Sequence, residues 1–136
     1  RSGRSSGKTG KDQPHQLSKN TDFLMLFDER CKYFFSNDIS SVSPYHNSSW
    51  PDDPEERERY IRDKRYDYIS TIVWPIRSCN ETDKIIVIGY LCIDSKEKDI
   101  FNEEIDVDFG ASVADLLYPI LYAYRANFVI SGEMTE

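Results

Sequence analysis

The sequence predicts a single α+β domain, because two adjacent strands are followed by an amphipathic helix. Residues 69–77 are rich in β-branched and aromatic side chains, and residues 84–94 form a second such run. Six turn-type residues, 78–83, separate the runs, so we expect an antiparallel hairpin. Apolar side chains then recur at helical spacing between residues 113 and 124. A chain of 136 residues is long enough to bury the core of one such domain.

The residues of each predicted strand indicate whether it lies at the edge or in the centre of the sheet. Pro75 has no backbone N–H to donate, so we expect an edge position, a bulge or a bend in the first strand. Residues 85–88 of the second strand are Ile, Ile, Val and Ile, which makes this stretch apolar on both faces. Such a run favours a central strand, on which Cys92 would be a small buried hydrophobic side chain.

The aromatic region at residues 17–39 is compatible with two structures. Phe23, Phe27 and Cys31 are spaced as on one face of a helix, whereas two aromatic runs around the charged residues 28–30 would suit a hairpin. We favour a helix for the first run, because residues 20–22 (Asn-Thr-Asp) offer a cap before it. Residues 36–38 (Ser-Asn-Asp) after the second run are typical of a stop.

A long loop and a surface helix are predicted next. Residues 40–54 are rich in Ser, Asn, Pro and Asp, yet this stretch also carries Tyr45, His46, Asn47 and Trp50. Loops of this composition either bind ligands or are packed down by their aromatic residues. Asp53 followed by Pro and two Glu residues is typical of a helix start, and we expect a solvated helix from there to about residue 65.

The clearest amphipathic helix lies near the C-terminal end. Asn102 with Glu103 and Glu104 predicts its start, and Asp106 and Asp108 belong to the same acidic helix start rather than to a catalytic pair. Pro119 costs about 3 kcal/mol in the interior of a straight helix, so we expect a kink near residues 115–118. The apolar stripe of this helix consists of Val113, Leu116, Leu117, Ile120, Leu121 and Tyr124.

Charge is unevenly distributed along the chain. The total is −7, but residues 1–19 hold five basic residues and one acidic residue, a net +4, so the other 117 residues carry −11. We interpret residues 1–16 as a flexible basic linker, 17–130 as the domain and 131–136 as a tail. A body this acidic repels phosphate backbones, which argues against nucleic acid as a partner.

Several kinds of chemistry lack the residues they need. Residues 6–9 (Ser-Gly-Lys-Thr) resemble part of a phosphate-binding loop, but its first glycine, strand and helix are missing. His15 and His46 offer no cluster for a metal or a catalytic triad. Cys31, Cys79 and Cys92 are too widely spaced for a disulfide framework, and no apolar stretch approaches about 18 residues. We therefore expect a cytoplasmic domain that is not an enzyme, and we assign no cofactor.

One set of polar and aromatic residues on the loops and strands could line a small pocket. Amide, hydroxyl and aromatic groups that converge beside an apolar wall are the usual form of a ligand site, although Asn-Asp pairs also close turns. The candidate ligand-binding residues are Asn37, Asp38, Tyr45, Asn47, Tyr68, Ser70, Thr71 and Tyr90.

Residues 70–77 (STIVWPIR), a turn, residues 88–95 (IGYLCIDS), then Phe101, Glu103 and a final helix resemble the GAF family in their order. The resemblance covers residues 66–125. It implies a central, mostly antiparallel sheet with helices on one face and a loop-covered pocket over the other. It also implies a regulatory or dimerising module that acts through its terminal helices. The stretch before residue 70 is shorter than in typical members, which implies a shortened pocket.

Three functions follow from these observations. The first is a sensory or regulatory GAF-like domain of a larger protein that binds a small ligand. The second is a ligand-free dimerisation or protein-docking module, with an interface at Val113, Leu117, Leu121 and Tyr124. The third is a diverged free methionine sulfoxide reductase, because residues 92–95 (Cys-Ile-Asp-Ser) resemble a strand of those relatives, although their cysteine constellation is not matched. The basic linker would also suit attachment to an upstream membrane segment.

Overall fold

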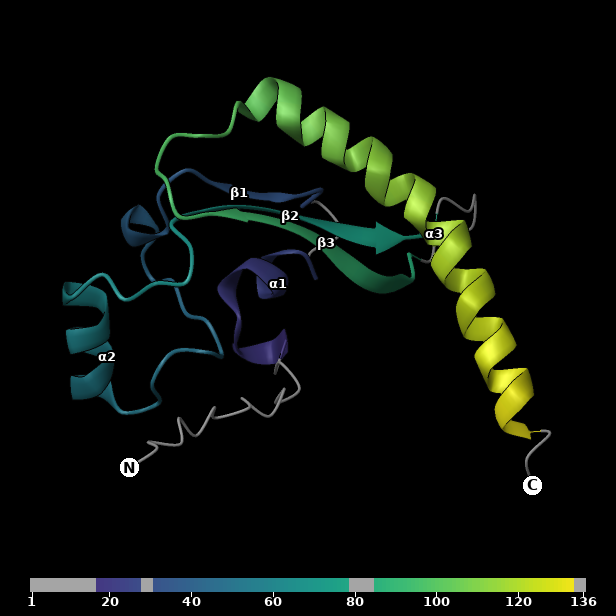
Figure 1. Cartoon of the computed structure of the whole chain (residues 1–136), viewed down its shortest axis with the longest axis horizontal. Helices are drawn as coiled ribbons and strands as arrows, with labels where there is room; N and C mark the ends of the chain where they lie inside the picture. Colours follow the sequence, from purple (N-terminus) through teal and green to yellow (C-terminus); the bar gives the residue numbers. More distant parts are fainter. Residues whose placement is uncertain (1–16, 28–30, 79–84, 134–136) are drawn as a thin grey trace, which may run out of the picture.

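The domain consists of a three-stranded sheet with a long helix on one face. A computed structural model describes residues 17–27, 31–78 and 85–133, with side chains described up to residue 127. The helices are α1 (Thr21–Met25), α2 (Pro54–Arg62) and α3 (Glu103–Glu133), and the strands are β1 (Phe34–Ser36), β2 (Ser70–Arg77) and β3 (Val87–Ser95) (Figure 1). The predicted α+β class is confirmed. Helix α3 covers one face, while α1 and residues 39–50 lie on the other, so the helices are not confined to one face.

The predicted hairpin is confirmed, but its strands take different places from those expected. The strand order is β1-β2-β3, and β2 and β3 pair antiparallel from Ser70 with Ser95 to Arg77 with Val87. The prediction that the second strand is central is wrong, because β2 lies in the middle and β3 pairs only with β2 among the described strands. The apolar run that favoured a central strand lies partly before β3, where Ile85 and Ile86 are exposed.

Pro75 lies where the sheet is only two strands wide. The pairs between β1 and β2 end at Phe34 with Val73, so β2 is paired at Pro75 with Tyr90 of β3 alone. A residue without an N–H is tolerated where one side of a strand has no ladder to maintain. The register also shifts between Ile76 and Arg77, as expected for an irregularity near this proline.

The contact between the sheet and α3 is organised around Trp74. Its indole is 1 % exposed, and its Nε1 donates a hydrogen bond of 3.0 Å to the carbonyl oxygen of Val107. The ring lies so close to α3 that a Cβ added to Gly110 would be 2.2 Å from the Cζ2 atom of Trp74. Gly110 therefore lets the helix backbone approach the indole directly. Ile72, Ile76, Val107 and Ala114 complete this cluster.

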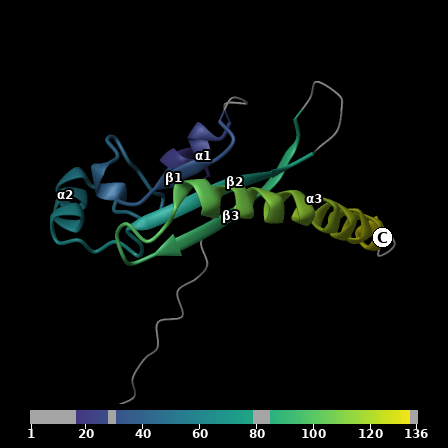
Figure 2. The ribbon, with the colours of Figure 1, turned by 90° about the horizontal axis from the view of Figure 1, so that it is seen from above.

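Helix α3 starts as predicted, but a different face of it is buried. The side chain of Asn102 accepts hydrogen bonds from the backbone N–H groups of Glu104 and Ile105. Val107, Gly110 and Ala114 are buried against the sheet, whereas residues 119–127 are exposed. The predicted apolar stripe thus reaches the sheet only in part, because the helix continues past the sheet (Figure 2). Pro119 lies inside α3, and the helix bends along its length (Figure 1).

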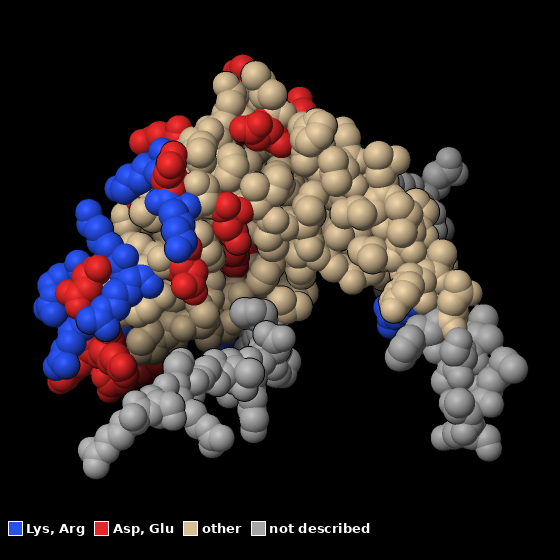
Figure 3. Space-filling view, viewed as in Figure 1, with Lys and Arg blue, Asp and Glu red and all other residues tan. Residues whose placement is uncertain are grey.

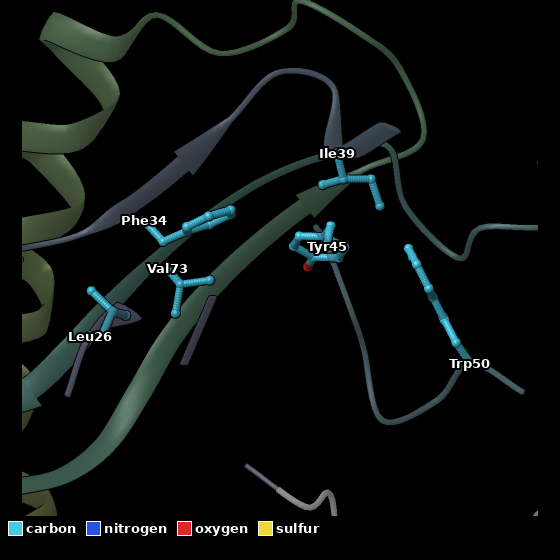
Figure 4. Close-up of a cluster of buried hydrophobic side chains, with 6 residues drawn as sticks. All are labelled: Leu26, Phe34, Ile39, Tyr45, Trp50 and Val73. Atoms are coloured by element: carbon cyan, nitrogen blue, oxygen red, sulfur yellow. The ribbon is translucent and has the colours of Figure 1, made fainter. Parts of the chain in front are cut away.

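A second cluster of buried side chains lies on the opposite face of the sheet. Val73 of β2 and Phe34 of β1 pack with Leu26, Ile39, Tyr45 and Trp50 (Figure 4). The Trp50 ring centroid is 5.5 Å from that of Tyr45 and 5.6 Å from that of Tyr66. The long loop is therefore packed down by its aromatic residues. It also leads into α2, whose predicted cap is confirmed by the 2.9 Å bond from Glu56 N to Asp53 Oδ1.

The N-terminal aromatic region forms a helix and then a strand rather than a hairpin. The predicted helix is confirmed as α1, although it ends at Met25 and residues 28–30 lie outside the described residues. The second run becomes β1, which ends at Ser36 where a stop was predicted. Residues 1–16, most of the predicted turn at 78–83 and residues 134–136 also lie outside the described residues. Within the described part of the chain, no helix is long and apolar enough to cross a membrane.

We expect Gly110→Ala to destabilise the domain, although alanine is the better helix former. An exposed glycine-to-alanine change in a helix gains up to about 1 kcal/mol. Here the new methyl group would overlap the Trp74 ring, and overpacking of this kind costs about 1–3 kcal/mol. The free energy of unfolding of Gly110→Ala, measured in urea, should therefore be lower than that of the parent protein.

The matched control is Gly89→Ala, whose new methyl group would lie 3.8 Å from the Ile76 Cδ1 atom, an ordinary contact. This variant should change the free energy of unfolding by less than about 1 kcal/mol. The cost of Gly110→Ala should also shrink when Trp74 is replaced by Leu. A Gly110→Ala protein as stable as the parent would contradict the close packing of Trp74 on α3.

Candidate functional site

A groove of about 370 Å³ lies on the sheet face opposite α3, and we call it the sheet groove. Its floor comes from alternate residues of β2 and β3, because successive side chains of a strand point to opposite faces. Its walls come from the start of α1, the long loop and the segment before β2. The lining residues are Asn20, Asp22, Phe23, Asn47, Ser49, Asp67, Tyr68, Thr71, Val73, Cys92 and Asp94.

The long loop is tied to the start of α1, which fixes one wall of the groove. Thr21 N donates a bond of 2.9 Å to the carbonyl of His46, and His46 N donates one of 2.8 Å to Thr21 Oγ1. Asn20 Oδ1 accepts a bond of 2.5 Å from Ser48 N. Asn20 was predicted as a helix cap, but its side chain makes no cap bond and binds the loop instead.

A directed chain of hydrogen bonds runs along this wall to Asp22. Asn47 Nδ2 donates to the Tyr68 hydroxyl at 2.7 Å, and the hydroxyls of Tyr68 and Tyr45 are 2.8 Å apart. Tyr45 in turn donates to Asp22 Oδ2 at 3.2 Å. Because Tyr45 gives its proton to Asp22, Tyr68 is the donor to Tyr45. Each group in the chain therefore donates its hydrogen towards Asp22. This direction stabilises a negative charge on the Asp22 carboxylate.

Asp22 is a buried acid without a basic partner among the residues that line the groove. Its side chain is 3 % exposed, and its Oδ1 accepts a bond of 2.9 Å from Phe23 N. Burial raises the pKa of Asp22 above its usual value, since the charged form loses hydration, although the bonds from Phe23 and Tyr45 oppose this shift. None of the described lining residues is Lys, Arg or His.

Two side chains of β3 complete the floor. Thr71 Oγ1 donates a bond of 2.6 Å to Asp94 Oδ1, which links β2 to β3 across the floor. The prediction that Cys92 is a buried core residue is wrong, because β3 is an edge strand and the side chain is exposed. Although the residue as a whole is exposed, neighbouring groove atoms partly desolvate its thiol and, with the carboxylates of Asp94 and Asp22, raise the pKa of Cys92 to about 12. The thiol is therefore protonated at neutral pH.

Five of the eight predicted ligand-binding residues lie in or beside the sheet groove. Asn47, Tyr68 and Thr71 line it, and Tyr45 lies one hydrogen bond behind Tyr68. Tyr90 borders it through the Phe23 ring, whose centroid is 4.6 Å from that of Tyr90.

The other three predicted residues hold the connection between β3 and α3. The side chain of Asn37 donates to the carbonyl of Phe101 at 2.9 Å and accepts from the N–H of Phe101 at 3.1 Å. Asp38 forms an ion pair with Lys98. Ser70 Oγ lies 2.8 Å from the carbonyl oxygen of Asn37, so the structure does not bring these residues to the groove.

Several residues that line the groove were not among the predicted ligand-binding residues. They include the amide of Asn20, the ring of Phe23 and the carboxylates of Asp22, Asp67 and Asp94. Asn20 and Asp22 read as helix-cap residues in the sequence. Asp94 could have been found, because Tyr90, Cys92 and Asp94 alternate along one face of a strand. Among the described residues, no three His, Cys, Asp or Glu side chains are grouped so that they could hold a metal ion.

Comparison of the chain with protein-family models, with curated proteins and with solved structures finds no match.

We expect Asp22→Asn to stabilise the free domain at neutral pH. The folded-state pKa of Asp22 is raised, so its contribution to stability is present at low pH and lost as the pH rises through that pKa. Asparagine keeps the shape of the side chain without the buried charge. At pH 7 the variant should gain on the order of 1 kcal/mol, or a few degrees in melting temperature. The gain should disappear on acidification, as measured by thermal unfolding between about pH 4 and pH 8.

Asp67→Asn provides the control, because Asp67 lines the same groove but is exposed. It should stay within about 0.5 kcal/mol of the parent at each pH. The titratable groups around Asp22 are Asp94, Cys92 and Tyr90 of β3 together with Tyr45 and Tyr68. A variant that melts below the parent at neutral pH would refute the assignment of Asp22 as an unpaired buried charge.

Proposed function

We propose that this chain is a regulatory domain that binds a small ligand in the sheet groove and transmits binding to α3. The observation that carries the proposal is the groove itself, which lies over the sheet face opposite the long helix. The resemblance of residues 66–125 to the GAF family favours the same arrangement, with a pocket over the sheet and a terminal helix as the output. On this proposal the domain serves a larger protein.

The composition of the groove supports small-molecule binding. Phe23 and Val73 supply apolar surface, and the amide, hydroxyl and carboxylate groups of the other lining residues converge on the same space. Its volume of about 370 Å³ is at the lower end of the range for small-molecule sites, roughly 300–1,000 Å³. The bonds from the long loop to α1 hold the wall in place before any ligand arrives, which limits the entropy lost on binding.

Strand β2 provides a short physical connection between the groove and α3. Thr71 and Val73 line the groove, while their neighbours Ile72 and Trp74 pack on the opposite face against α3. A ligand that moves Thr71 or Val73 therefore also acts on Trp74, which contacts α3 at Gly110. Close-packed cores transmit such displacements because they have little free volume.

The reductase alternative is less well supported. A nucleophilic cysteine needs a lowered pKa and a nearby positive charge, whereas the pKa of Cys92 is raised to about 12 beside two carboxylates. Of the other two cysteines, Cys31 packs against the cluster around Trp50, and Cys79 lies outside the described residues.

The proposal predicts that a groove ligand protects Cys92 from alkylation. The purified domain would be screened by thermal unfolding against nucleotides, amino acids, tetrapyrroles and small amines, because a ligand of the folded state raises the melting temperature. Each hit would then be tested for its effect on maleimide labelling at mildly alkaline pH, with an incubation long enough for the largely protonated Cys92 thiol to react, quantified for each cysteine by mass spectrometry. Cys92 labelling should slow at least about tenfold at 100 times the Kd.

Cys31 serves as an internal control, because it does not line the groove and its labelling should not change. A ligand that stabilises the domain without protecting Cys92 would place its site elsewhere. The absence of any stabilising compound from all four classes would count against small-molecule binding.

A second candidate function, dimerisation through α3, is favoured by the exposed apolar surface of that helix. Leu116, Ile120 and Tyr124 are 69 %, 63 % and 70 % exposed. Figure 3 shows almost no charged atoms over the part of α3 that extends past the sheet on this face. Of the predicted interface residues, Leu121 and Tyr124 belong to this surface, whereas Leu117 is half-buried against the sheet and Val113 is half-buried.

The dimer hypothesis predicts that Ile120→Lys combined with Leu121→Lys yields a monomer that remains folded. Both side chains are exposed, so their replacement should leave the core intact. Light scattering would measure the molar mass across a concentration series, with circular dichroism as the test of folding. Leu17→Lys, an exposed leucine outside α3, is the matched control and should not change the mass. A parent protein that is monomeric at high concentration would exclude this candidate.

A further inference from the structure

The electrostatic character of the sheet groove narrows the class of ligand it can hold. Three carboxylates, those of Asp22, Asp67 and Asp94, line it, and no described lining residue carries a positive charge. Charges of one sign around a partly desolvated groove focus the field and raise the local concentration of ions of the opposite sign. An anionic ligand would have to overcome this field.

The burial of Asp22 is a second, independent observation that points to a cation. A buried ion normally has a partner of opposite charge, because lost hydration is costly. Within the described residues, the donors that bond the Asp22 side chain are neutral, namely the N–H of Phe23 and the hydroxyl of Tyr45. The chain from Asn47 through Tyr68 and Tyr45 is oriented to support a negative charge at this position. The side chain lines the groove, so a ligand there can supply the missing positive charge.

The arrangement suits an organic cation better than a metal ion. Within the described residues, the acidic side chains of the groove do not form a group of three that could hold a metal. Both carboxylate oxygens of Asp22 already accept hydrogen bonds. A larger cation with spread charge needs no such coordination and can interact with all three carboxylates across a few ångströms.

The aromatic wall adds a complementary surface for such a cation. The Phe23 ring lines the groove and is supported from behind by Tyr90, at a centroid distance of 4.6 Å. Aromatic faces attract ammonium groups, and the apolar side chain of Val73 can contact the carbon atoms around the nitrogen. We propose that the ligand of the sheet groove is a small organic cation, an alkylated or primary ammonium compound held by Asp22 and Phe23. This inference rests on the proposed binding function of the same groove.

The test compares two probes of equal shape and different charge. Choline carries a quaternary ammonium group, and 3,3-dimethyl-1-butanol is its uncharged isostere. Phenethylammonium and phenethyl alcohol form a second such pair with an aromatic ring. Binding would be measured by titration calorimetry and by protection of Cys92 from maleimide. We expect each cation to bind at least about tenfold more tightly than its neutral partner.

Two variants and one pH series test how much Asp22 contributes to the affinity for the cation. Asp22→Asn should weaken binding of the cation at least about tenfold, whereas Asp67→Asn should weaken it less because Asp67 is exposed. The readout is the ratio of the affinities for choline and its neutral isostere, which should fall further in Asp22→Asn than in Asp67→Asn. In the parent protein, affinity for the cation should fall on acidification as Asp22 becomes protonated, and this measurement does not depend on any variant.

The outcomes distinguish this inference from the proposed function. Suppose that a neutral or anionic compound binds tightly and protects Cys92, and that the cations bind no better. This result would overturn the inference, while the binding function stands. Equal affinities of choline and its isostere, or an Asp22→Asn protein that binds choline like the parent, would also overturn it. If no compound of any charge binds or protects Cys92, both the inference and the proposed function fail.

Discussion

The approach of the Trp74 indole to the backbone of α3 at Gly110 is the contact on which the rest of the domain depends. The part of the sheet that the structure describes has three strands and little surface to bury, so its central strand must pack on both faces. One face is closed by an indole that touches the helix where no side chain intervenes and donates to the carbonyl of Val107. This contact fixes the position of α3, and it leaves the other face of β2 available for a groove.

The alternation of β2 gives the domain two faces with different roles. Ile72, Trp74 and Ile76 form the apolar contact with α3, whereas Thr71 and Val73 lie under the groove. Because adjacent residues of a strand point to opposite faces, the two sites are separated by a single peptide unit. This layout is the physical basis of the proposed transmission from the groove to α3.

If the sheet groove binds a ligand as proposed, Asp22 is kept there at the expense of the stability of the free domain. Its burial raises its pKa, so the charged form opposes folding in the absence of a partner of opposite charge. The surrounding amide and phenol groups stabilise the charge only in part, since all of them are neutral. Residues that destabilise a free domain in this way are typical of binding sites, where the missing interaction is supplied by the ligand.

Local sequence patterns specify the short-range elements of this protein. The Asp53 cap of α2 and the Asn102 start of α3 depend on residues a few positions apart, and β2 and β3 are neighbouring segments with strong strand composition, so these elements could be predicted. The candidate residues Asn47, Tyr68 and Thr71 could be selected by type, but not distinguished from Asn37, Asp38 and Ser70, which share that type and bind the backbone elsewhere. Tertiary structure alone decided which strand is central, which face of α3 is buried and which acids surround the groove. These properties arise from contacts between distant segments, such as Tyr45 with Asp22 and Trp74 with Val107, whose geometry no local pattern contains.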